Sequence, residues 1–211
     1  MTDRIRLFEI LMVILTGSGK IIFIDFLEVK LIYIITVIVF WFIYFFWRVS
    51  KNRSLIKYWG LSFSNSKETF KIIGIIGTIV IISFIIYGIY KNTIQLRWSI
   101  LFTLLIYPLW GLVQQFLMMS LFAGNLKDLK SGNINNFVII GLTSFLFSII
   151  HFPSVPLIIA TFLMAIFYSI IFLHKRNIIP LGIFHGVLGG LFYYFVLNRD
   201  PWLELISSIK K

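Results

Sequence analysis

Long uninterrupted runs of apolar residues dominate this chain and restrict it to structures that are stable in a lipid bilayer. A membrane-spanning helix needs about 20 predominantly apolar residues, whereas the strands of a membrane barrel alternate apolar and polar residues. Only helices and closed barrels satisfy their backbone hydrogen bonds in lipid. We therefore predict an all-α fold, a polytopic transmembrane helix bundle, with six firm helices at residues 31–47, 72–90, 98–124, 137–151, 155–173 and 178–197.

A further apolar segment, residues 7–27, is interrupted near its middle. Gly17, Ser18, Gly19 and Lys20 would place small residues and one charge at the depth of the lipid tails. Two structures are compatible with this pattern. The segment spans the membrane as a seventh helix, or it lies along the membrane surface as an amphipathic helix.

The composition agrees with a membrane protein and excludes several other classes. Hydrophobic residues make up 59% of the 211 residues and charged residues only 13%, whereas a soluble domain is about one quarter charged. A net charge of +11 would suit nucleic acid, but the basic residues lie in short loops, as topology signals and contacts to anionic lipids do. We expect membrane lipids as partners and no nucleic acid. The absence of cysteine excludes disulfides, thiolate metal sites and a cysteine nucleophile.

The distribution of basic residues predicts the orientation of the helices. The loop at residues 48–71 is the most basic, which places it in the cytoplasm; it contains Arg48, Lys51, Arg53, Lys57, Lys67 and Lys71 against the single acid Glu68. Alternation then places residues 126–136 and 174–177 inside and residues 91–97 and 152–154 outside. The C-terminus falls outside although it is basic. The expected location is a cell membrane, the cytoplasmic membrane of a bacterium.

Few polar side chains interrupt the apolar helices between residues 98 and 197, and these are the candidates for function. They include Gln114, Gln115, His151 and His185, whereas every acid falls outside the helices predicted in this segment. Such groups are costly to bury in lipid, so they usually face the bundle interior, as a site or as a hydrogen bond between helices. For the glutamines the alternative is bonding between helices. For His151 the alternative is an interfacial position at a helix end.

Two local patterns describe the surroundings of the histidines. Phe147 and His151 are four residues apart, so they share one helix face. His185 lies within a ridge of small residues formed by Gly182, Gly186 and Gly190. Such a ridge lets a second helix approach closely. His185 is therefore predicted to be buried against protein rather than lipid.

Three motifs in order along the chain carry a resemblance to a known family. They are Gln114-Gln115-Phe-Leu-Met-Met119, Phe147-Ser-Ile-Ile-His151 and His185-Gly-Val-Leu-Gly189. They resemble the Glu-Glu-x-x-x-Arg, Phe-x-x-x-His and His-x-x-x-Asn motifs of the CPBP family, the CAAX-protease and bacteriocin-processing (Abi) intramembrane proteases. The resemblance covers residues 98–197. It implies a protease-like helical core at 98–198, after N-terminal membrane helices at 1–97 and before a C-terminal tail at 199–211, in one structural domain.

The resemblance implies a mechanism and a set of site residues. In that family a glutamate, helped by two histidines and an asparagine, activates water to cut a peptide bond in or beside the membrane, and some members trim prenylated CAAX proteins. Bacterial members are linked to bacteriocin maturation and immunity. The positions matching the catalytic residues are Gln114, Gln115, His151 and His185. Substrate-binding positions are expected at Phe147, Met118 and Gly189.

Four positions depart from the family pattern and put activity in doubt. Gln114 and Gln115 replace both glutamates, Met119 replaces the arginine and Gly189 replaces the asparagine. A carboxylate can take a proton from water, but a neutral amide cannot. Catalytic zinc would need a third protein ligand besides two histidines, and a base, so no metal or other cofactor is expected.

Three functional hypotheses remain open. The first is a family member with a degraded site, which holds a membrane-embedded or lipidated peptide, or acts as an immunity or scaffold protein, with weak or no cleavage. The second is an active variant in which His151 or His185 is the base. The third is a transporter or channel-like bundle with a polar path, although the chain lacks the internal symmetry that many transporters have.

Overall fold

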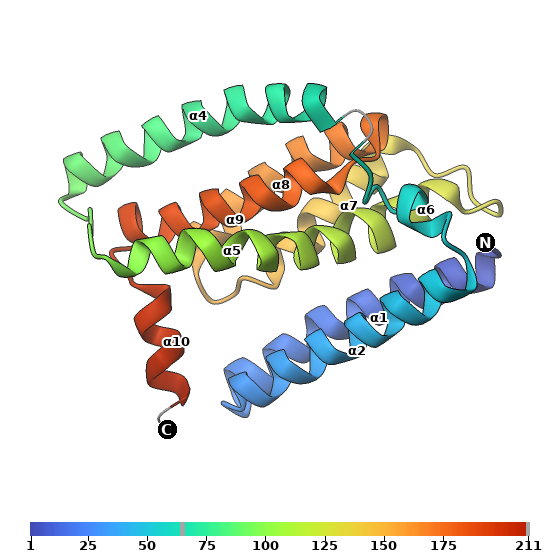
Figure 1. The fold of residues 1–211 in the computed structure, drawn as a ribbon, viewed down its shortest axis with the longest axis horizontal. Coiled ribbons are helices and arrows are strands. Elements are labelled where there is room, and N and C mark those ends of the chain that lie inside the picture. Colours follow the sequence, from blue (N-terminus) through green and yellow to red (C-terminus); the bar gives the residue numbers. More distant parts are fainter. Residues whose placement is uncertain (64–65, 210–211) are drawn as a thin grey trace. The chain divides into compact units, whose positions relative to one another are not determined.

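The computed structural model describes residues 1–63 and 66–209, and it confirms the all-α fold class (Figure 1). The chain is 81% helical, without strands among the described residues. Six helical segments are long and apolar enough to cross a membrane; they are Asp3–Phe26, Lys30–Lys51, Ser66–Lys91, Ser99–Asp128, Val155–Lys175 and Ile178–Phe195. The chain is therefore a multi-pass membrane protein.

The first segment, whose course the sequence left open, is one of these six spans. Helix α1 (Asp3–Lys20) continues directly into a π-helix, η1 (Ile21–Phe26). The charge of Lys20 is compensated because its Nζ donates to Asp25 Oδ2 and to the carbonyl oxygen of Phe152, each at 2.6 Å. Neither partner is apparent from the apolar pattern alone.

The helix predicted at residues 137–151 forms within two residues of its predicted bounds, but it is shorter than a membrane span. Helix α7 (Asn136–Ile149) has only 14 residues. Asn135 caps its start, since the side chain accepts a hydrogen bond from the backbone N–H of Phe137. At the other end the backbone N–H of His151 bonds to the carbonyl of Ser148 at 3.0 Å, which closes a turn. His151 therefore lies on a turn beyond the helix.

The chain divides into two compact units. Unit 1 comprises Met1–Ser62 and Phe116–Arg176, and unit 2 comprises Phe63–Gln115 and Asn177–Lys211. Unit 1 contains α1, η1, α2 (Lys30–Lys51), α3 (Leu55–Tyr58), η2 (Phe116–Ala123), α6 (Gly124–Asp128), α7 and α8 (Val155–Lys175). Unit 2 contains α4 (Ser66–Lys91), α5 (Ser99–Gln115), α9 (Ile178–Phe195) and α10 (Pro201–Ile209).

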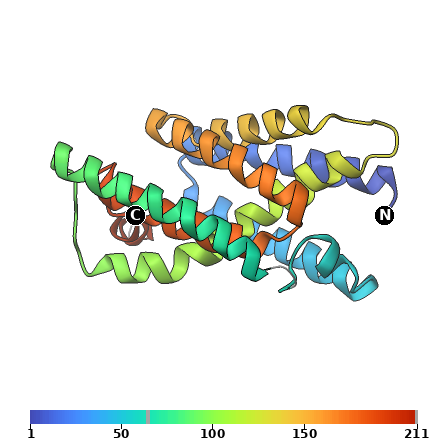
Figure 2. The same cartoon turned by 90° about the horizontal axis from the view of Figure 1, so that it is seen from above.

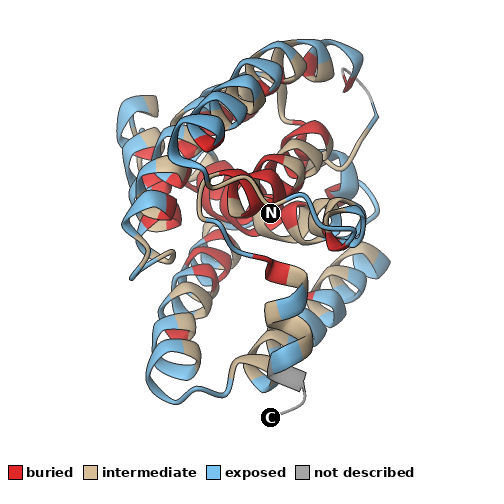
Figure 3. Cartoon of the chain, turned by 90° about the vertical axis from the view of Figure 1, so that its left-hand side faces the viewer, coloured by how far each residue is buried: buried red, intermediate tan, exposed pale blue. Residues whose placement is uncertain are grey.

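The core of unit 1 is built around η2, a π-helix in which every residue is buried. Helices α1, α7 and α8 contact it, and α7 packs along α8 as an antiparallel hairpin. Aromatic rings of Phe45, Trp59 and Phe116 pack together beside it, with centroids 5.2–5.7 Å apart. Many large apolar residues are exposed, as a surface that faces lipid requires, and Figure 3 marks exposed positions along the helices in pale blue.

The core of unit 2 is α9, which contacts α5 and α4. Figure 2 shows α4, in green, running along α9, in red. The small-residue ridge of α9 provides the predicted close approach. A Cβ added at Gly182 would lie 2.6 Å from Leu112 Cα, and one at Gly186 would lie 2.3 Å from Pro108 N. Only glycine fits at these two positions, so the prediction of a close helix contact is confirmed.

The turn between α9 and α10 is fixed by Asp200, which is buried. Its carboxylate accepts hydrogen bonds from Ser99 Oγ at 2.5 Å, from Tyr194 OH at 3.0 Å, and from the backbone N–H groups of Trp202 and Leu203. Burial acts to raise the pKa of Asp200, but these hydrogen bonds outweigh it and lower the pKa below the ordinary value. Asp200 thus anchors α10 as a charged carboxylate.

Candidate functional site

The structure joins one glutamine and one histidine of the predicted site within unit 2. Gln114, in the last turn of α5, places its Oε1 2.6 Å from Nε2 of His185 on α9. An amide oxygen can only accept, so His185 Nε2 carries the hydrogen and donates it. His185 is 8% exposed, as predicted for a histidine buried against protein. Two residues 71 positions apart therefore meet through one short hydrogen bond.

Glycines on both helices make this hydrogen bond reachable. A Cβ added at Gly111 of α5 would lie 2.2 Å from the carbonyl oxygen of Gly182 on α9. Real Cβ atoms do not come this close to backbone, so any side chain here would push the helices apart. Gln114 lies three residues beyond Gly111, and His185 three residues beyond Gly182. The amide–imidazole contact is thus a direct consequence of the glycine contact.

Gln115 differs from its neighbour although it carries the same side chain. It is fully buried, and neither Nε2 nor Oε1 has a hydrogen-bond partner among residues 1–63 and 66–209. It is the last residue of α5, and the π-helix η2 begins at Phe116. π-Helical turns are rare and are frequent at functional sites. Gln115 therefore combines an unsatisfied buried amide with an unusual backbone.

His151 lies in unit 1, on the turn that follows α7. Its Nδ1 lies 2.8 Å from the carbonyl oxygen of Phe147, so Nδ1 donates and Nε2 holds the lone pair. The two rings contact edge to face, with centroids 5.2 Å apart. The pKa of His151 is lowered to about 4, mainly by burial; the Phe147 carbonyl opposes the shift and the ammonium of Lys20 adds to it. The imidazole is therefore neutral at pH 7.

The predicted substrate-binding positions lie in different surroundings. Phe147 and Met118 are buried in unit 1. Gly189 lies on α9 in unit 2, and a Cβ added there would meet nothing within 4 Å. Met119, at the position of the family arginine, is fully buried, and Ser169 Oγ donates to its sulfur at 3.8 Å. Roles in substrate binding stay predictions.

The sequence predicted no role for Glu9, an acid within the first apolar segment. Glu9 of α1 is fully buried. Its Oε1 accepts from Tyr44 OH at 2.5 Å and its Oε2 from Asn125 Nδ2 at 2.6 Å, while Arg48 Nη2 lies 3.7 Å from Oε1. The signal was present: an acid inside an apolar run of spanning length marks a functional or structural site by default.

Glu9 is too far from His151 to exchange a proton with its imidazole. Lys20 of the same helix contacts the turn that carries His151. Glu9 lies eleven residues earlier on α1, which is roughly 16 Å along the helix axis. A general base must reach its partner directly or through one water. The bonded cluster of Glu9, Tyr44, Asn125 and Arg48 therefore holds α1, α2 and α6 together.

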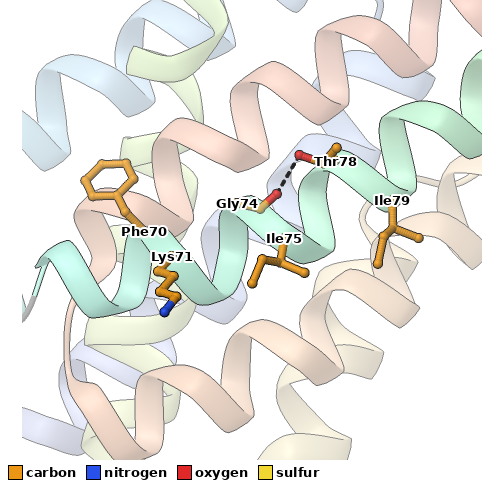
Figure 4. A pocket seen from close by; sticks show the side chains of 6 residues that line it. All are labelled: Phe70, Lys71, Gly74, Ile75, Thr78 and Ile79. Carbon is orange, nitrogen blue, oxygen red and sulfur yellow. Dashed lines mark hydrogen bonds between the residues drawn. The ribbon is translucent and has the colours of Figure 1, made fainter.

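A shallow groove runs along one side of α4 (Figure 4). It has a volume of about 450 Å³ and is lined by Phe70, Lys71, Gly74, Ile75, Thr78 and Ile79. The hydroxyl of Thr78 is directed back to the carbonyl of Gly74 at 2.8 Å. The lining is mostly apolar and includes none of the candidate residues, so the groove offers no chemistry of its own.

No group of three or more His, Cys, Asp or Glu side chains gathers in the described part of the chain in a way that could hold a metal ion. The polar groups within the spans include the Gln114–His185 pair, the Gln115 amide and the Glu9 cluster. The chain is thus a multi-pass membrane protein with an amide–imidazole pair between α5 and α9.

Comparison with known proteins finds a family match for part of the chain. Residues 95–191 match the family model described as type II CAAX prenyl endopeptidase Rce1-like. The match covers less than half of the chain, and it confirms the resemblance carried by the three motifs. No curated protein and no solved structure matches the chain significantly.

Proposed function

We propose that this protein is a CAAX-endopeptidase-like member that binds a membrane-embedded or lipidated peptide but cleaves it weakly or not at all. The observation that carries the proposal is the hydrogen bond from His185 Nε2 to Gln114 Oε1. The motif match puts an amide where the family resemblance implies a catalytic carboxylate. A role as an immunity or scaffold protein in a bacterial cytoplasmic membrane suits such a member.

The chemistry of the pair explains the expected loss of activity. Gln114 has no proton-accepting group of useful basicity, and the Nε2 hydrogen of His185 already bonds to its oxygen. Neither atom of this contact can take a proton from water. General acid–base catalysis typically contributes about 10²–10⁴-fold in rate. Gly189 also offers no donor to a developing oxyanion, and losing one such donor typically costs about 10²–10³-fold.

An active variant with His151 as the base is the second candidate. The Phe147 carbonyl fixes Nδ1 as the donor, which leaves the Nε2 lone pair to accept a proton. The low pKa of His151, about 4, makes this nitrogen a weak base at neutral pH, because the best catalytic pKa lies near the operating pH. Any turnover through His151 is therefore expected to be slow.

A cleavage assay in reconstituted bilayers tests the proposal. Wild type and the variants His151→Ala and His185→Ala are incubated with a fluorescent prenylated CAAX peptide, and binding is followed by polarisation while cleavage is followed by mass spectrometry. The proposal expects binding by wild type with little or no product. Rapid wild-type cleavage that His185→Ala abolishes would overturn it, and cleavage that depends on His151 alone would favour the second candidate.

A further inference from the structure

The turn that carries His151 is held by a helix outside the family-matched residues. Helix α1 comes close to it twice within unit 1. A Cβ added at Gly17 would lie 3.0 Å from Cγ2 of Ile150, the residue before His151. Lys20, one helical turn later, donates from Nζ to the carbonyl oxygen of Phe152, the residue after His151, at 2.6 Å. The two contacts therefore bracket the histidine.

The ammonium of Lys20 has a second fixed partner. Nζ also donates to Asp25 Oδ2 at 2.6 Å, and both side chains are about one quarter exposed, 25% and 26%. Asp25 lies on η1, the π-helix that continues α1. The ammonium is thus held between a carboxylate of its own span and a backbone carbonyl of the turn. A charge-assisted bond of this kind is roughly twice as strong as a neutral one.

We propose that Lys20 is a positioning residue for His151, supplied by α1 from outside the family-matched segment. Its bond to the Phe152 carbonyl fixes the turn, while the Phe147 carbonyl fixes the ring through Nδ1. Together these contacts present Nε2 in one orientation. The Lys20 ammonium also disfavours a second positive charge nearby, so it helps to keep the imidazole neutral. The inference rests on the proposed function only in treating His151 as a residue of the functional site.

The first test measures the histidine itself and needs no activity. Protein with ¹⁵N-labelled histidine in nanodiscs is titrated by NMR, and His151→Gln assigns the signal. Lys20→Met is expected to raise the pKa of His151 and broaden its signal, because a nearby positive charge and the turn contact are both lost. Lys20→Arg keeps the charge and is expected to restore the wild-type titration. An unchanged titration in folded Lys20→Met would overturn the proposal.

A second test checks the geometry if Lys20→Met folds poorly. The chain has no cysteine, so the pair Gly17→Cys and Ile150→Cys is the only possible disulfide. Oxidation is expected to cross-link this pair in the membrane, whereas Gly17→Cys with Gly141→Cys, on the same α7 hairpin, stays reduced. Failure of the first pair to cross-link would show that α1 does not hold the turn.

An activity readout separates this inference from the proposed function. In a background made active by Gln114→Glu, Lys20→Met is expected to lower kcat with little change in KM, and Lys20→Arg to restore it. If the Gln114→Glu variant is inactive, the proposed relation of this site to the peptidases is refuted. The NMR titration of His151 still decides the role of Lys20. Equal kcat with and without Lys20 in an active background would count against positioning.

Discussion

Replacing Gln114 by glutamate puts a carboxylate against the imidazole of His185 and restores the group that the family resemblance implies at this position. The change is nearly isosteric, and the Oε1 to Nε2 distance is already 2.6 Å. A neutral hydrogen bond becomes a charge-assisted one, which is about twice as strong. We therefore expect Gln114→Glu to fold with the same helix contact.

The expected gain in rate follows from the missing general base. Restoring it is worth about 10²–10⁴-fold, or about 2.7–5.4 kcal/mol at 1.36 kcal/mol per factor of ten. The oxyanion donor would still be absent at Gly189. A Cβ added at Gly189 meets nothing within 4 Å, so Gly189→Asn is expected to fit. Adding it to Gln114→Glu should give a further gain of about 10²–10³-fold.

The assay is single-turnover cleavage of a prenylated CAAX peptide in proteoliposomes. Gln95→Glu is the matched control, because it makes the same chemical change in the loop before α5, where Gln95 bonds to Asn198. The control should cleave no faster than wild type. If both Gln114→Glu and the double variant fold, bind peptide and still show no product, the reasoning that links the pair to peptide hydrolysis is refuted.

Three further substitutions, two of them paired with a control variant, test the packing and charges described above. Gly182→Ala should destabilise the protein by about 1–3 kcal/mol through overpacking against α5, whereas Gly189→Ala should be nearly neutral; thermal unfolding in detergent compares them. Glu9→Ala should cost about 3–5 kcal/mol because it leaves buried donors and a cation without their partner. Glu204→Ala, at an exposed ion pair, should cost no more than about 1 kcal/mol. Asp200 is more acidic folded than unfolded, so its stabilising contribution should be present at neutral pH and be lost as the pH falls below about 4. Asp200→Asn should remove that part of the pH dependence of unfolding, and an unchanged pH profile would contradict this assignment.

The parts of the fold that the sequence predicted depend on local patterns. Apolar runs located the spans, and the glycine spacing of α9 predicted a close contact with another helix, which the structure identifies as α5. Both patterns act through residues near one another on one helix. The three motifs likewise lie on single helices, and the family match over residues 95–191 agrees with them.

The parts that the sequence did not predict depend on partners distant along the chain. Lys20 made the first segment doubtful, but its charge is balanced by the Phe152 carbonyl, 132 residues away, as well as by nearby Asp25. Glu9 is stabilised by Asn125, 116 residues away. Helix α7 ends early because a backbone turn forms within an apolar run, so hydropathy gave no sign of it. Such partners are set by tertiary packing.

The proposed function depends most directly on the hydrogen bond between Gln114 and His185. Solid-state NMR of protein in bilayers, with ¹³C-labelled glutamine and ¹⁵N-labelled histidine, measures the coupling between the Gln114 amide carbon and His185 Nε2. We predict a strong coupling and a hydrogen on Nε2, and we predict that the coupling is lost in Gly182→Leu, which forces the helices apart. A Gln114 signal without coupling to any histidine would contradict this prediction.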